Sequence, residues 1–192
     1  MGASIKEFVA NSQAYQARLL QYAIERYRAA KYAPMTGLFQ FMFVECWPSI
    51  TWAVVDYFRR PKLGYEALKR AYQPVLPAII AEREVWQRGD PRRAIHYEVT
   101  VVNDQPRGCE SATVRTWVLD PAGNRMAEDE VHLDLPPDSA TPCPRRRHDE
   151  GPRCPLPADA PLGTYTIGAS VHSAEGELLG ENVWTVEVVA GP

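Results

Sequence analysis

The sequence predicts an α+β protein in which a short helical segment is followed by an antiparallel β-sandwich. Helical spacing of apolar residues is confined to the first part of the 192-residue chain. Short alternating segments separated by turn residues occupy the remainder. A single apolar run, residues 38–44, lies between the two stretches with helical spacing. We therefore predict two domains, residues 1–76 and residues 77–192.

The composition is that of an ordinary globular chain, with 45% hydrophobic and 23% charged residues. A formal net charge of −3 gives no electrostatic basis for binding nucleic acid or an anionic membrane surface. No run of about 18 apolar residues predicts a transmembrane helix, and no signal-peptide pattern is visible. The sequence leaves the compartment and the oligomeric state open.

The first predicted helix spans residues 11–32. Tyr15 and Tyr27 belong to an apolar stripe with helical spacing, and we expect this stripe to face the core. Glu25 and Arg28 are expected on the solvated face. The stripe thus sets the predicted orientation of the helix.

A strand and a second helix are predicted next. Residues 38–44 are almost continuously apolar. This pattern is typical of a strand in a parallel sheet whose two faces are both covered. Residues 64–72 carry an apolar stripe between Pro61 and Pro74 and are predicted to form a short helix. The first domain is therefore a helix–strand–helix unit.

The second domain shows the alternation of half-buried strands. A strong turn signal occupies residues 121–124. Several short strands with turn residues between them indicate an immunoglobulin-like antiparallel β-sandwich. The predicted strands are residues 79–86, 94–103, 112–120, 130–135, 164–172 and 182–189.

A cluster of polar and aromatic residues directly follows the apolar run at 38–44. Glu45 and Trp47 lie there, at the carboxyl end of the predicted strand. In α/β barrels this end of a strand carries the residues that face the substrate. The placement therefore indicates the edge of a binding site.

The order of residues in this region resembles the last barrel strand of family 2 glycoside hydrolases, the β-mannosidase and β-galactosidase-like enzymes. The resemblance extends to nearly the whole chain. The matching residues are Phe41-Met42-Phe43, Glu45, Trp47-Pro48, Ser49, Trp52, Val55-Asp56-Tyr57 and Pro61-Lys62.

The resemblance implies that residues 1–76 are the C-terminal remnant of a TIM-barrel domain, the terminal helix–strand–helix of a (β/α)8 barrel. It implies retaining hydrolysis of a β-linked sugar by two glutamates, and no cofactor. Both glutamates would lie on strands upstream of this chain. Glu7 precedes an apolar pair but lacks the strand that should lead into a nucleophile. We therefore expect no catalytic residue here, and the sequence leaves open whether the chain by itself is an enzyme.

Glu45 and Trp47 are the candidate substrate-binding residues. An indole face can stack on the C–H face of a sugar ring, and a carboxylate can accept hydrogen bonds from hydroxyl groups. The alternative is that Trp47 packs the mouth of the barrel and Glu45 is solvated. The sugar that would bind is not determined by these residues.

The cysteines admit three interpretations. Cys143 and Cys154 enclose a short loop, and a disulfide between them would favour an oxidising compartment. Free thiols are the second interpretation. A metal site with His148 is the third, but it lacks a fourth ligand at a standard spacing, and we predict no metal. Cys46 is expected to be a buried free thiol.

A second function remains open for the whole chain, that of a non-catalytic β-sandwich binding or interaction module with an N-terminal docking segment. The sequence directly upstream would discriminate between the two. The expected partners are carbohydrate, weakly or only in a full-length enzyme, and the remaining barrel or a second copy, through the strand at 38–44. We expect neither nucleic acid nor a membrane as a partner.

Overall fold

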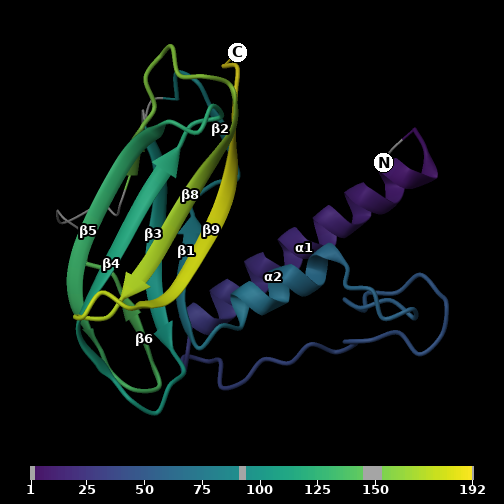
Figure 1. Cartoon of the computed structure of the whole chain (residues 1–192). Coiled ribbons are helices and arrows are strands. Elements are labelled where there is room, and N and C mark those ends of the chain that lie inside the picture. Colours follow the sequence, from purple (N-terminus) through teal and green to yellow (C-terminus); the bar gives the residue numbers. More distant parts are fainter. Residues whose placement is uncertain (1–2, 91–93, 145–152, 192) are drawn as a thin grey trace. The chain divides into compact units, whose positions relative to one another are not determined.

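The computed structural model describes residues 3–90, 94–144 and 153–191 (Figure 1). The chain divides into two compact units, Met1–Gln73 and Pro74–Pro192, which we call the helical unit and the sandwich unit. The division lies slightly upstream of 76/77, because the first sandwich strand already begins at Val75. No helix in the described parts of the chain is long and apolar enough to cross a membrane.

The helical unit contains α1 (Ile5–Ala29) and α2 (Leu63–Ala71), which pack against each other (Figure 1). The first helix begins earlier than predicted, because Ser4 provides its N-cap. The Ser4 hydroxyl accepts a hydrogen bond from Glu7 N at 3.2 Å, and Glu7 Oε2 accepts one from Ala3 N at 2.6 Å. These reciprocal bonds, close to a capping box, satisfy backbone N–H groups that the first turn leaves unpaired.

The predicted orientation of α1 is wrong. Tyr15 is 70% exposed and Tyr27 is 47% exposed, whereas Glu25 and Arg28 are buried. Arg28 lies inside because its guanidinium donates to the carbonyl oxygens of Ala71 and Gln73 at the C-terminal end of α2. A cation at this position satisfies carbonyl groups that have no partner within the helix.

The predicted strand at residues 38–44 is not formed. This segment is extended but irregular, and its link to a neighbour is an isolated bridge between Val44 and Val55. Phe39 and Phe41 are 91% and 83% exposed. The described part of the helical unit contains no β-strand with which residues 38–44 could pair in a sheet, so the apolar run has no regular backbone partner.

The sandwich unit consists of two sheets (Figure 1). The first has the order β1-β3-β6, with β7 also paired to β3, and the second has the order β2-β9-β8-β4-β5. Neighbouring strands are antiparallel except β2 and β9, which are parallel. The first sheet comprises β1 (Val75–Ala81), β3 (Ala94–Asn103), β6 (Ser139–Pro142) and β7 (Arg153–Pro155). The second comprises β2 (Val85–Gln87), β4 (Cys109–Leu119), β5 (Arg125–Leu135), β8 (Gly163–His172) and β9 (Leu178–Val189).

Several details of the predicted sandwich differ from the structure. The strands β5 and β9 begin at Arg125 and Leu178, earlier than the predicted starts at residues 130 and 182. The predicted strand at 79–86 is two strands, β1 and β2, which belong to different sheets. The short strands β6 and β7 were not predicted. Both hold only three or four residues, too few for alternation to be recognised.

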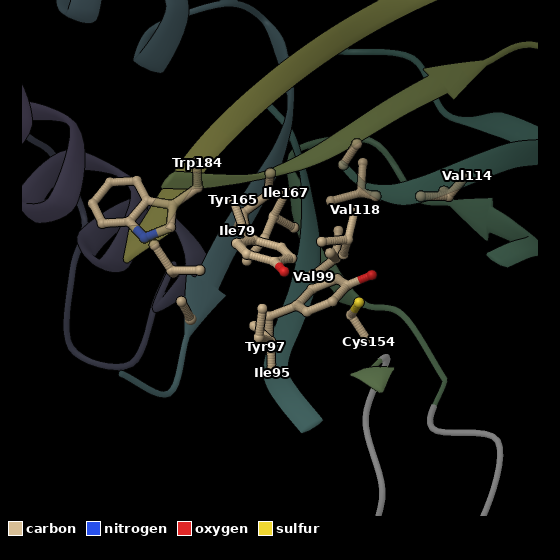
Figure 2. Packing of buried hydrophobic residues seen from close by; sticks show 14 of the residues in the cluster. Ile79, Ile95, Tyr97, Val99, Val114, Val118, Cys154, Tyr165, Ile167 and Trp184 are labelled. Carbon is tan, nitrogen blue, oxygen red and sulfur yellow. The ribbon is translucent and has the colours of Figure 1, made fainter. Parts of the chain in front are cut away.

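The two sheets enclose one core. Figure 2 shows Ile95, Tyr97 and Val99 of β3 together with Tyr165 and Ile167 of β8 in this cluster. The pKa of Tyr97 is raised to about 12 because burial disfavours the charged phenolate. Alternate residues of the strands therefore supply a continuous hydrophobic interior, as predicted.

Candidate functional site

The candidate site is the loop of residues 46–53 in the helical unit, which we call the tryptophan loop. Backbone hydrogen bonds close it at its base. Glu45 N donates to Val55 O at 3.1 Å, and Val55 N donates to Phe43 O at 3.0 Å. A third bond, from Lys62 N to Val54 O at 2.9 Å, joins the base to the start of α2.

Glu45 lies beneath this loop and is only 3% exposed. Its Oε1 atom accepts a hydrogen bond from Lys62 Nζ at 3.0 Å and another from the Thr51 hydroxyl. Lys62 is itself largely covered, with 16% of its side chain exposed. These groups form a compact ionic cluster of Glu45, Thr51 and Lys62.

The pKa of Glu45 lies below its ordinary value of 4.5. The hydrogen bond from Thr51 is the largest cause, followed by the hydrogen bond from Lys62, while burial acts in the opposite direction. Glu45 is therefore a carboxylate at neutral pH, and it is held by groups of the protein.

The tryptophan loop presents two exposed indole rings. Trp47 is 69% exposed and Trp52 is 65% exposed. The backbone of Trp52 is fixed to α1, because Gln16 Nε2 donates to its carbonyl oxygen at 2.7 Å. The two predicted site residues thus differ in position, since Trp47 reaches the surface and Glu45 is enclosed behind it.

A tight turn follows the loop. Asp56 Oδ1 accepts a hydrogen bond from Arg60 N at 2.9 Å, and Asp56 Oδ2 forms an ion pair with Arg60 Nε at 2.8 Å. The pKa of Asp56 is lowered mainly by the backbone hydrogen bond from Arg60. Asp56 therefore organises the turn that leads to Lys62.

Cys143 and Cys154 are free thiols in the structure, which is the second of the three interpretations of the cysteines. Cys143 N donates to Val99 O, and Cys154 pairs with Ile95, so both cysteines lie along the same edge of β3. Four residues of a strand separate their Cα atoms by about 13 Å, and a bridge tolerates only about 7 Å. Burial raises the pKa of Cys143 to about 12 and that of Cys154 to about 11.

Two other cysteine predictions have different outcomes. Cys46 is a free thiol but is exposed rather than buried, because it lies on the tryptophan loop. His148, the third residue of the metal alternative, lies outside the described residues. Among the residues that the structure describes, no group of three or more His, Cys, Asp or Glu side chains is arranged to hold a metal ion.

The sandwich unit has a surface hollow of about 540 Å³ near the start of β4. Asn103 lies in its wall, but its amide is used internally. Asn103 Nδ2 donates to Arg107 O at 3.0 Å and to Pro136 O at 2.9 Å, and Asn103 Oδ1 accepts from Gln105 N at 3.0 Å. The lining residues include no aromatic ring. The hollow therefore lacks the platform that Trp47 provides.

The sequence missed Thr51 and Lys62 as members of the site. Lys62 belongs to the Pro61-Lys62 pattern of the family resemblance, but its distance from Glu45 along the chain does not indicate that the two side chains are in contact. A buried acid is normally paired, so an acid at the end of an apolar run is the signal that a cation should be sought.

Known proteins resemble this chain over parts of their length. β-Mannosidase B of Aspergillus niger is 31% identical over 101 residues, which are 50% of this chain and 12% of that protein. β-Mannosidase B of Emericella nidulans is 38% identical over 61 residues, 31% of this chain and 7% of that protein. No protein-family model matches the chain. The chain thus spans a small fraction of its curated relatives.

Solved structures resemble nearly the whole chain. A β-D-mannosidase from Dictyoglomus thermophilum matches 97% of it with a TM-score of 0.71 and 20% identity, and the match covers 20% of that protein. An exo-chitosanase from Amycolatopsis orientalis matches 98% of it with a TM-score of 0.69 and 17% identity, again over 20% of that protein. At these identities the likeness shows the fold.

Together these matches support a resemblance between this chain and a part of glycoside hydrolase family 2 proteins. The sequence relatives named above are β-mannosidases. The predicted family resemblance is confirmed at this level, and so is the α+β fold with its β-sandwich.

Proposed function

We propose that the chain is the C-terminal portion of a retaining glycoside hydrolase that acts on β-linked sugars, of the β-mannosidase kind. The observation that carries this proposal is the 31% identity to β-mannosidase B over 101 residues. The helical unit would be the end of the TIM-barrel domain. The sandwich unit would be an immunoglobulin-like domain, which is supported by its two sheets of short, mostly antiparallel strands.

The isolated chain is proposed to be inactive. Retaining hydrolysis requires two carboxyl groups about 5–5.5 Å apart, one as nucleophile and one as acid and base. Glu7 is engaged in the N-terminal cap of α1, and Glu45 is engaged by Thr51 and Lys62. Neither group is poised to attack a sugar or to transfer a proton to one.

Trp47 is the proposed contact to the sugar. Its indole ring is mostly exposed on a loop whose base is fixed by hydrogen bonds. Aromatic faces bind the apolar face of a pyranose ring, with polar groups supplied from other parts of the site. In the isolated chain this contact alone would give weak binding.

The exposed apolar surface of the helical unit is proposed to be an interface. It includes Phe39, Phe41 and Ile50, which are 91%, 83% and 97% exposed. An apolar surface of this kind marks an interaction site. In a longer enzyme the remaining barrel would cover it, and in the isolated chain a second copy would.

The function is tested by assaying the purified chain with aryl β-mannoside, β-galactoside and β-glucuronide substrates, beside Glu7→Gln and Glu45→Gln variants. No turnover above background is expected from any of these proteins. Turnover that either substitution abolishes would show that the active site lies within this chain. The genomic sequence directly upstream provides a second test, since an in-frame barrel with glutamates at two strand ends is expected.

One observation favours the alternative of a non-catalytic interaction module. Tyr15 and Leu19 lie in the exposed apolar stripe of α1, as a docking segment would require. An upstream sequence without a barrel would support this alternative.

A further inference from the structure

The carboxylate in the ionic cluster of Glu45, Thr51 and Lys62 is almost completely enclosed. Glu45 is 3% exposed, whereas Asp56, in the neighbouring ion pair with Arg60, is 22% exposed at its side chain and Arg60 is 72% exposed. Burying an ion pair costs solvation free energy that excellent geometry must offset. In some proteins such a pair fixes one conformation, which is its best-attested use.

The cluster adds side-chain contacts to the backbone hydrogen bonds that close the base of the tryptophan loop. Glu45 precedes the loop, Thr51 lies within it, and Lys62 precedes α2. Lys62 Nζ lies 3.0 Å from Glu45 Oε1 and 3.5 Å from the carbonyl oxygen of Thr51. The Thr51 hydroxyl also accepts a hydrogen bond from Ala53 N at 3.2 Å. Both arms of the loop are therefore tied to one carboxylate.

We propose that Glu45 is a positioning residue, which acts through Lys62 and Thr51 to hold the tryptophan loop in one conformation and thereby fixes the exposed rings of Trp47 and Trp52 for a pyranose ligand. This rests on the function proposed above. It replaces the interpretation that Glu45 itself binds the sugar hydroxyls. The reason is that Oε1 of Glu45 already accepts hydrogen bonds from two groups of the protein.

A fixed loop matters because the tip of the loop is exposed to solvent. Its tip includes Ile50, which is 97% exposed, and the Trp47 ring is 69% exposed. Among the described residues, the cluster and the bond from Gln16 to Trp52 O hold the tip. Preorganising a binding group reduces the ordering entropy that the ligand must otherwise offset.

The test uses the whole 192-residue chain, in which 5-fluorotryptophan replaces the five tryptophans. Each labelled residue is expected to give its own ¹⁹F NMR signal. Trp→Phe variants assign the signals. In Glu45→Gln and Lys62→Met the signals of Trp47 and Trp52 should broaden or split, whereas those of Trp86, Trp117 and Trp184 should not change. The double variant should resemble either single variant, because both substitutions remove the same interaction.

Matched controls separate positioning from a general loss of charge. Arg60→Gln removes the exposed neighbouring pair and should leave the Trp47 and Trp52 signals unchanged. Lys62→Arg keeps the cation and should preserve them more than Lys62→Met does. If Glu45→Gln unfolds the helices, Thr51→Val decides the question, because it keeps the ion pair and should broaden the same two signals. Unchanged Trp47 and Trp52 signals in Glu45→Gln, or in Thr51→Val when Glu45→Gln unfolds, would overturn the proposal.

Titration with methyl β-D-mannoside distinguishes this proposal from the function on which it rests. In Glu45→Gln the Kd should rise about tenfold, the factor expected when the competent loop is populated about a tenth of the time. Weaker binding with unchanged indole signals would make Glu45 a direct ligand and contradict the positioning role. Broadened indole signals, with no sugar bound by any form, would support positioning and contradict the sugar site.

Discussion

The two units of this chain bury their apolar side chains to very different extents. In the described residues the sandwich unit has a core of 22 buried residues drawn from both sheets. The corresponding cluster of the helical unit has five, Ile24, Val54, Val55, Leu68 and Ala71. The units, Met1–Gln73 and Pro74–Pro192, differ less in length than in the size of their cores, and the helical unit has many exposed aromatic residues. The units differ in whether apolar residues find partners within the same unit.

This difference indicates which unit can fold by itself. In the sandwich, alternate residues of each strand meet residues of the opposite sheet, so each burial contributes to stability. Full burial of a Val, Leu, Ile or Phe side chain stabilises a fold by about 1.5–3 kcal/mol. In the helical unit the exposed Phe39 and Phe41 contribute nothing of this kind. We therefore expect the sandwich to be the more stable unit.

The largest effect is expected from a matched pair of isoleucine substitutions. Ile95 is completely buried and Ile50 is 97% exposed. Ile95→Ala should lower the free energy of unfolding of the sandwich by about 2–5 kcal/mol, because it leaves a cavity. Ile50→Ala should change stability by less than about 0.5 kcal/mol. Urea titration measures both, and equal losses would contradict the comparison.

The cysteines should show the same contrast in reactivity. Cys46 is exposed on the tryptophan loop, whereas the pKa values of Cys143 and Cys154 are raised to about 12 and about 11 by burial. Because the thiolate is the reactive form, the two sandwich thiols should react at least about a hundredfold more slowly than Cys46 near pH 8. Time-resolved alkylation with peptide mass spectrometry measures the rates.

The same experiment tests the absence of the bridge. All four thiols should be countable in the unfolded, unreduced protein, since none is bonded in the structure. Two thiols that appear only after reduction would support the disulfide interpretation instead.

A smaller effect is expected where Trp117 lies against Gly168. A Cβ atom added to Gly168 would lie 2.2 Å from the indole of Trp117, so the ring would have to move. Gly168→Ala should therefore cost about 1–3 kcal/mol of unfolding free energy. In a Trp117→Ala background the same substitution should cost much less. A cost that persists in that background would place the strain in the backbone.

The smallest effect concerns acid pH and the helical unit. Because the pKa of folded Glu45 lies below its ordinary value of 4.5, this carboxylate stabilises the fold at higher pH. The contribution is lost as the pH falls through the lowered pKa. The helix signal in circular dichroism should weaken over that range, and Glu45→Gln should lack this component. An identical acid profile in both proteins would exclude Glu45 as its source.

The strands of the sandwich could be predicted because the alternation of apolar and polar residues is visible within each strand. Alternation assigned β3 to residues 94–103, which are its observed bounds. The inward-facing residues of a strand need only an opposite sheet to be buried. The split between β1 and β2 was missed, because the choice of sheet depends on pairing with distant strands such as β9.

The helical unit was harder to predict because the burial of its residues depends on contacts with residues that are distant in the sequence. The period of α1 was recognised, but its buried face was not, since Arg28 is buried by bonds to carbonyls 43 and 45 residues away. The apolar run at 38–44 was assigned as a strand, although the described helical unit has no strand to pair with it. At the site, the sequence predicts Trp47 and Glu45 as candidate binding residues, whereas the burial of Glu45 beside Lys62 cannot be predicted from their spacing.

The central claim is that the sandwich unit is stable by itself and the helical unit is not. Native-state hydrogen exchange of the whole chain tests it most directly. Amides of β3, β4 and β8 should exchange only by global unfolding, at roughly 5–15 kcal/mol. Amides of α1 and α2 should exchange through openings that cost a few kcal/mol or less. Protection of α1 equal to that of β4 would contradict the account. It would show that the helical unit is stable without a partner to bury its exposed apolar residues.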